Sequence, residues 1–190
     1  KVTQDNNREI YGMALMGSRG EGPFYEFLAR LWPLGGHMFD ADMKPTFGDE
    51  AGFKALDMMV KQFTEWKNTP PGAVNYQFDD VVTGLQQGSI ASALLWSSMQ
   101  AYIVDETKTS VPPDKFGYSI APGSAEIRFL TQGGGGHGLG ISPDSKNIEA
   151  AWDYLKWLFS REGTLKMAKA GNGAPTTYSA YEDQELLSLY

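Results

Sequence analysis

The chain has 190 residues, of which 42% are hydrophobic, so it can form one ordinary domain with a substantial core. Its 23 acidic and 16 basic side chains give a net charge of −7. This charge argues against binding to nucleic acids or to anionic lipid, since both use clustered Lys and Arg. The lack of cysteine excludes thiolate sites, and two histidines are too few for a histidine-rich metal site. We therefore expect no cofactor and no metal.

Strands and helices are predicted to alternate along the chain. Short apolar runs predict four buried strands, over residues 11–17, 89–95, 116–121 and 139–141. Apolar residues at helical spacing predict five main helices, from Pro23 to about residue 32, from Glu50 to about residue 64, and over residues 78–85, 143–158 and 161–169. This alternation indicates an α/β fold, with a mixed sheet covered by helices on both faces.

Two of these helices carry a clear apolar stripe, which is the pattern of a helix side that faces a core. The stripe of the helix from Glu50 consists of Phe53, Leu56, Met59, Val60 and Phe63. The stripe of the helix after Pro143 consists of Ile148, Ala151, Trp152, Leu155 and Leu158.

Two motifs for bound ions or cofactors are incomplete. The glycines of residues 133–138 have a dinucleotide-binding spacing, but the expected strand follows them instead of preceding them. We interpret this run as a flexible connection. Asp40, Asp42 and Glu50 do not complete a calcium-binding loop, so we predict a polar turn there.

Several aromatic residues lie in polar or glycine-rich loops, which favours carbohydrate binding. Sugar rings pack on aromatic faces, and their hydroxyls need planar polar partners. Tyr25 with Arg19 and Glu21 would supply both, and Trp96 is followed by two serines. The alternative is that Phe24 and Trp96 are core residues.

Paired carboxylates leave a glycosidase open as a second reading. The candidate pairs are Glu21 with Glu26 and Asp79 with Asp80. No serine-nucleophile motif occurs, and His137 is expected to be a loop residue instead of a catalytic base.

The stretch from Gly138 to Gly163 resembles the family 1 extracellular solute-binding proteins of bacterial ABC importers, which include maltose-binding proteins. The resemblance rests on a glycine-rich loop and a short strand, then Ser145-Lys-Asn147, Glu149-Ala-Ala-Trp152 and an aromatic helix ending in Ser160-Arg-Glu162. Residues 85–91 and 35–47 also resemble elements of this family in the same order.

This resemblance implies a periplasmic-binding-protein-like (type II) lobe and a hinged receptor that closes on its solute without catalysis. Residues 8–132 would form the C-terminal lobe. Residues 133–190 would form a hinge strand and helices that pack on an N-terminal lobe, most of which would precede Lys1. We therefore expect a fragment whose helices 143–170 lack their usual cover and could form a dimer through it.

The resemblance also implies a ligand, a partner and a site. The ligand would be a sugar or polyol, delivered to an ABC transporter permease. The protein would be periplasmic or extracellular, and membrane-tethered in a Gram-positive bacterium. The candidate ligand contacts are Arg19, Glu21, Tyr25, Trp96, Ser97, Ser98, Gly136 and His137. The alternatives are a carbohydrate-active hydrolase that uses Glu21 or Asp79, and an interaction domain without a transport role.

Overall fold

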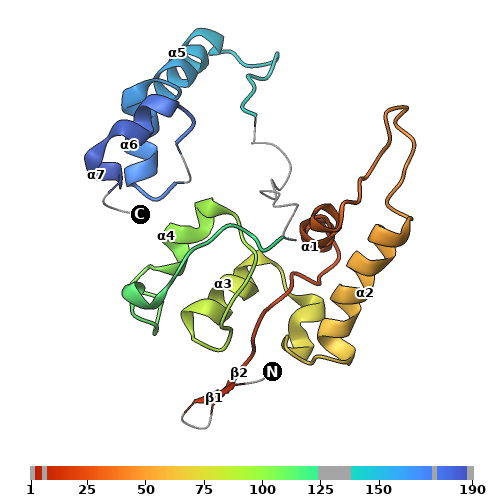
Figure 1. Ribbon diagram of the computed structural model, residues 1–190. Helices are drawn as coiled ribbons and strands as arrows, with labels where there is room; N and C mark the ends of the chain where they lie inside the picture. The colour runs from red at the N-terminus through yellow and green to blue at the C-terminus, as the bar shows by residue number, and fades with distance from the viewer. Residues whose placement is uncertain (1–2, 6–7, 124–137, 173–174, 188–190) are drawn as a thin grey trace. The chain divides into compact units, whose positions relative to one another are not determined.

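The computed structural model describes residues 3–5, 8–123, 138–172 and 175–187, and these form two compact units (Figure 1). The first unit comprises Lys1–Leu95 and Ile103–Gly133, and the second comprises Trp96–Tyr102 and Gly134–Tyr190.

Two pairings of extended chain organise the first unit. Strands β1 (Thr3–Asp5) and β2 (Arg8–Ile10) form an antiparallel pair. The chain after β2 then runs parallel to residues 90–93, with bridges between Tyr11 and Ile90 and between Ala14 and Ala93. Both bridges have the same register, so the predicted strands at 11–17 and 89–95 are neighbours, although only isolated bridges join them.

The other two expected strands are wrong. Residues 116–121 and 139–141 have no strand structure, and Ile120 and Leu139 are 51% and 54% exposed. A strand needs a neighbour to pair its backbone N–H and C=O groups, and local hydrophobicity does not supply one. Within the described residues, the mixed sheet with helices on both faces is therefore not confirmed.

Three predicted helices of the first unit are confirmed, and local signals explain where they begin. These are α1 (Gly22–Leu31), α2 (Glu50–Thr64) and α3 (Phe78–Gln86). Pro23 lies in the first turn of α1, where its missing N–H has no intrahelical partner to lose. The carboxylate of Asp49 accepts the N–H of Gly52 at 2.9 Å and so caps α2. Gly35, with φ of 79°, ends the 3₁₀ turn Trp32–Leu34 that follows α1.

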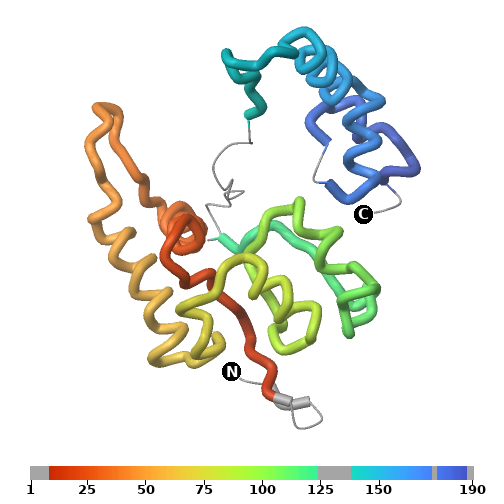
Figure 2. The backbone as a smooth tube through the Cα atoms, turned by 180° about the vertical axis from the view of Figure 1, so that it is seen from behind, coloured from red at the N-terminus to blue at the C-terminus, as the bar shows by residue number. Residues whose placement is uncertain are grey.

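Helices α1 and α2 pack side by side, as both backbone views show (Figures 1 and 2). Their common core consists of Leu28, Leu31 and Ala55, with Phe27, Trp32, Met38 and Ala51 packed around it.

The predicted core-facing stripe of α2 is largely wrong. Phe53, Leu56 and Val60 are 68%, 52% and 50% exposed, whereas Gly52, Ala55 and Gln62 are buried. The reason is close approach: a Cβ atom on Gly52 would lie only 1.7 Å from the carbonyl oxygen of Phe47. Two small residues and Gln62 therefore face inward, whereas Phe53, Leu56 and Val60 face solvent.

The second unit is a small group of helices. It contains α5 (Ile148–Leu158), α6 (Arg161–Lys169) and α7 (Gln184–Leu187), with 3₁₀ turns at Ser97–Met99 and Tyr178–Glu182. The short helix α4 (Gln100–Ile103) directly follows the Ser97–Met99 turn, and the 3₁₀ turn Pro113–Lys115 belongs to the first unit. The core of the second unit consists of Leu165, Ala168, Ala180 and Leu186.

In the part of the chain that the structure describes, none of the residues of α5 is buried. Trp152 is 52% exposed, and Leu155 and Leu158 are half-buried. The expectation that this helix lacks cover is therefore consistent with its exposure.

Candidate functional site

The loop between the first extended segment and α1 is held by backbone hydrogen bonds where it begins. The N–H of Gly17 donates to Ala73 O and that of Ser18 to Tyr76 O, both at 3.0 Å. A Cβ atom on Gly17 would lie 2.4 Å from Ala73 O, and one on Gly22 would lie 2.7 Å from the Cβ atom of Met16. Glycine is required at both positions because other parts of the chain approach so closely.

A buried polar network lies on the inner side of α1, next to this loop. The side chain of Glu26 is 1% exposed, accepts the N–H of Met16 at 3.2 Å and lies 2.8 Å from Nη1 of Arg30. Nη2 of Arg30 donates to Oε1 of Gln62 on α2 at 2.9 Å, and Nε2 of Gln62 lies 3.4 Å from Sδ of Met13. The network therefore ties α1, α2 and the chain before the loop together.

Burial raises the pKa of Glu26, and Arg30 and the N–H of Met16 oppose this rise by favouring the carboxylate. The buried ion pair keeps each charge from being left alone in the core, where an unpaired charge is costly. Because its carboxylate is buried in this network, Glu26 is not available as one of a pair of glycosidase acids.

The outer side of α1 presents an exposed polar and aromatic group. The hydroxyl of Tyr25 donates to Oε2 of Glu21 at 3.2 Å. Partial loss of hydration and this carboxylate raise the pKa of Tyr25. The rings of Phe24 and Tyr25 lie 5.7 Å apart at 58°, and Arg19 is exposed in the same loop. A cation, an acceptor and an aromatic face thus lie within one short segment, and a polyhydroxylated ligand needs groups of these kinds.

The second group of predicted site residues belongs to the second unit. Trp96 follows the extended segment 90–95, and its carbonyl accepts the N–H of Met99 at 2.9 Å at the start of a 3₁₀ turn. The side chains of Trp96 and Ser98 are half-buried, whereas Ser97 is exposed. The structure thus brings together Arg19, Glu21 and Tyr25 in one unit and Trp96 to Ser98 in the other. Gly136 and His137 lie outside the described residues.

Two of the remaining acidic candidates, Asp80 and Asp40, make local capping or turn contacts. Asp80 accepts the N–H of Gln77 at 2.8 Å at the start of α3, and Asp79 lies in the first turn of that helix. Asp40 accepts the N–H groups of Asp42 and Lys44 at 2.9 and 2.8 Å, which confirms the predicted polar turn. The described residues contain no group of three or more His, Cys, Asp or Glu side chains that could hold a metal ion.

The Arg30–Gln62 contact was not predicted from the sequence, nor was the hydrogen bond from the N–H of Ser18 to the carbonyl oxygen of Tyr76. Glu26 and Arg30 are spaced i,i+4 on a helix, which signals an ion pair. Because Gln62 is 32 residues further along the chain, its contact with Arg30 has no local signal.

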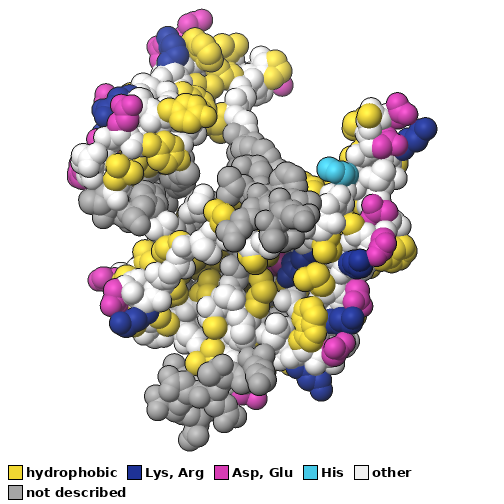
Figure 3. All heavy atoms as spheres, in the orientation of Figure 1, with side chains coloured by type: hydrophobic (Ala, Val, Ile, Leu, Met, Phe, Trp, Pro, Cys, Tyr) yellow, Lys and Arg dark blue, Asp and Glu magenta, His cyan; other side chains and the backbone are white. Residues whose placement is uncertain are grey.

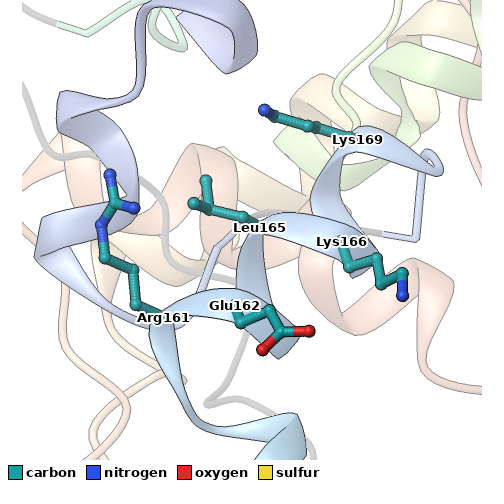
Figure 4. A pocket seen from close by; sticks show the side chains of 5 residues that line it. All are labelled: Arg161, Glu162, Leu165, Lys166 and Lys169. Atoms are coloured by element: carbon teal, nitrogen blue, oxygen red, sulfur yellow. The ribbon is translucent and has the colours of Figure 1, made fainter.

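An open pocket of about 390 Å³ lies on α6, lined by Arg161, Glu162, Leu165, Lys166 and Lys169 (Figure 4). Arg161 lies 3.9 Å and Lys169 3.1 Å from the carboxylate of Asp183. Because the carboxylates of Asp183 and Glu185 already pair with these two cations, the pocket is a weak candidate for an anion site.

Among the described residues, no helix combines the length and the apolar character that crossing a membrane would require.

Residues 1–165 match the family model described as bacterial extracellular solute-binding protein. A curated relative, the probable amino-acid ABC transporter periplasmic-binding protein y4oP of Sinorhizobium fredii, is 28% identical over 93% of this chain and 38% of its own. That relative is named as a binding protein, not as an enzyme.

Solved structures agree in fold. The maltose-bound MalE3 of T. maritima superposes with a TM-score of 0.79 at 26% identity, over 94% of this chain and 46% of its own. A solute-binding protein of an ABC transporter from Agrobacterium radiobacter, in complex with ribitol, gives a TM-score of 0.79 at 24% identity. The match covers 95% of this chain and 45% of that protein. The chain thus spans less than half the length of these proteins. It has the fold of the corresponding part of a solute-binding protein, and it belongs to the bacterial extracellular solute-binding protein family.

Proposed function

We propose that this chain is the ligand-binding part of an ABC-importer receptor for a sugar or polyol, periplasmic or extracellular, which hands its solute to a membrane permease without catalysis. The observation that carries the proposal is the loop from Gly17 to Gly22, whose start is held by two backbone hydrogen bonds and which contains Glu21 of the Glu21–Tyr25 pair. A fixed loop lowers the entropy lost when a ligand is ordered against it.

A sugar or polyol fits these groups better than an amino acid, although one relative is named as an amino-acid transporter protein. Glu21 already accepts from the neutral hydroxyl of Tyr25, so it is placed as a hydroxyl acceptor beside an aromatic ring. Two solved relatives hold maltose and ribitol, which are both rich in hydroxyl groups.

Each group of candidate residues follows the carboxyl end of one of two parallel segments. The segments that pair at Tyr11 with Ile90 and at Ala14 with Ala93 each lead directly into one group of candidate residues. Open α/β sheets bind ligands beyond the carboxyl ends of their strands. We take these segments as the centre of a mixed sheet with helices on both faces, in a type II lobe formed by residues 8–132, with hinge and helices in residues 133–190.

The exposed side of α5 would contact a further lobe or chain. Ile148 and Trp152 lie one turn apart and are 48% and 52% exposed, and α5 has no buried residue in the described structure. Exposed apolar surface of this kind often marks a site of contact with another protein. Dimer formation through residues 143–170 is one form that such contact would take.

Isothermal titration calorimetry tests the proposal with maltose, ribitol and L-alanine as probes. We expect heat of binding with maltose or ribitol, and a loss of about fivefold to tenfold in affinity in Trp96→Ala, as removal of one stacking partner would give. Trp66→Ala, at a tryptophan 42% exposed just after α2, is the matched control and should bind like wild type.

Binding of L-alanine alone would overturn the sugar or polyol class. Equal affinity in wild type and Trp96→Ala would remove Trp96 from the site. Turnover of a chromogenic glycoside that is lost in Glu21→Gln would favour the hydrolase instead.

A further inference from the structure

The exposed side of α2 is an apolar stripe bordered by a row of charges. Phe53, Leu56 and Val60 are spaced three and four residues apart and are each at least half exposed. At about 100° per residue, the charged residues of the helix lie together on one side of this stripe. They are Glu50, Lys54, Asp57 and Lys61. Figure 3 shows apolar side chains and charges of both signs along this edge of the molecule.

The order of the charges is self-complementary. Along α2 the signs alternate, from Glu50 to Lys54, Asp57 and Lys61. When two copies of the helix lie antiparallel about a two-fold axis, equivalent rows on the two copies face each other in reverse order. Glu50 then faces Lys61 of the second copy, and Lys54 faces its Asp57. Every charge in the row therefore meets the opposite sign.

Within one chain these charges are already paired along the helix, at 2.6 Å between Lys54 and Glu50 and at 2.7 Å between Lys61 and Asp57. All four side chains are between 39% and 83% exposed. Such surface pairs contribute little stability by themselves, so they can rearrange toward a second copy at small cost.

We propose that the exposed face of α2 is a homodimer interface in which two copies of the helix pack antiparallel about a two-fold axis. Phe53, Leu56 and Val60 form the apolar centre, and the charge row sets the orientation. A two-fold contact requires a patch that complements itself, and the charge row of α2 does so. A helix of 15 residues is about 22 Å long, so its face alone gives a small interface and a weak dimer.

Two charge-reversal variants test the pairing. Lys54→Glu with Lys61→Glu makes the row entirely acidic, and Glu50→Lys with Asp57→Lys makes it entirely basic. By sedimentation equilibrium up to about 1 mM chain, we expect wild type to self-associate and each variant alone to dimerise at least tenfold more weakly. An equimolar mixture of the two variants should form a heterodimer at least as tight as the wild-type dimer.

Matched controls separate this interface from other causes. Asp114→Lys with Lys115→Asp reverses an exposed ion pair in the 3₁₀ turn Pro113–Lys115 and should leave self-association unchanged. Circular dichroism checks that the variants fold, and Leu56→Ser tests the same face without changing its charge.

Three results would overturn the proposal. The first is a wild-type chain that stays monomeric, which would leave the α2 face to another segment of a longer polypeptide. The second is self-association that survives both the charge reversals and Leu56→Ser. The third is a mixture of variants that does not pair.

Discussion

Helices α2 and α5 both expose large apolar side chains, but only α2 is anchored by a buried side. Ala55 of α2 is completely buried and Gln62 is 4% exposed, with its amide bonded to Arg30. Helix α5 has no buried residue in the described structure. Small residues and one polar contact therefore decide which side of α2 faces inward, and the largest apolar side chains do not.

The largest expected effect comes from removing the polar anchor of α2. Arg30→Met would leave the carboxylate of Glu26 buried without its cation and Gln62 without its donor. We expect a loss of about 3–5 kcal/mol in the free energy of unfolding of the first unit, measured by urea denaturation. Lys156→Met breaks an exposed ion pair on α5 and should cost at most about 1 kcal/mol. Similar losses in both variants would contradict the contrast between the two helices.

Overfilling the packed side of α2 should have the next largest effect. Ala55→Leu adds a large side chain at a fully buried position, which costs about 1–3 kcal/mol in a tightly packed core. Ala151→Leu on α5 adds the same atoms at a half-buried position, where we expect a change of at most about 0.5 kcal/mol. Thermal unfolding of the two variants measures the difference, and an equal drop in midpoint would show that α5 is packed as tightly as α2.

The third prediction concerns pH and the second unit. The N–H of Leu186 and then the cation of Lys169 lower the pKa of Asp183 from its ordinary value of 3.8. Because the pKa is lower in the folded state, the stabilisation is complete above about pH 3.8 and is lost as the pH falls toward the folded value. Wild type should therefore lose stability below this pH more steeply than Asp183→Asn. Parallel stability curves for the two proteins would remove Asp183 from the account.

The smallest expected effect is on the exposed stripes themselves. Phe53→Ser on α2 and Trp152→Ser on α5 replace side chains that are 68% and 52% exposed. We expect each to change the free energy of unfolding of the isolated chain by at most about 0.5 kcal/mol, measured at dilutions where the chain is monomeric. A loss of several kcal/mol in either variant would mean that its stripe is a core surface.

Helix positions could be predicted from the sequence because their signals are local. Pro23, Asp49 and Ser160 mark the beginnings of α1, α2 and α6 within the span of one turn. The Glu21–Tyr25 contact is of the same kind, since residues four apart on a helix are neighbours.

The errors concern contacts between distant parts of the chain. The inward side of α2 depends on Gln62, which bonds to Arg30 32 residues earlier, and this contact is not visible in the apolar pattern of the helix itself. The runs at residues 116–121 and 139–141 have the composition of strands, but a strand forms only where a neighbour pairs with it. Of the candidate site, the part on α1 follows from local spacing, whereas the ligand roles of Trp96 to Ser98 stay a prediction.

The most direct test of the proposed function is an NMR titration of the 190-residue chain with ribitol and maltose, which also detects weak binding. The account predicts shifts of backbone amide signals concentrated in residues 18–25 and 96–98. It also predicts that Tyr25→Ala weakens these shifts, whereas Tyr178→Ala, at a tyrosine 95% exposed on the second unit, leaves them unchanged. Shifts confined to other residues, or no shifts with either solute while the chain stays folded, would contradict it.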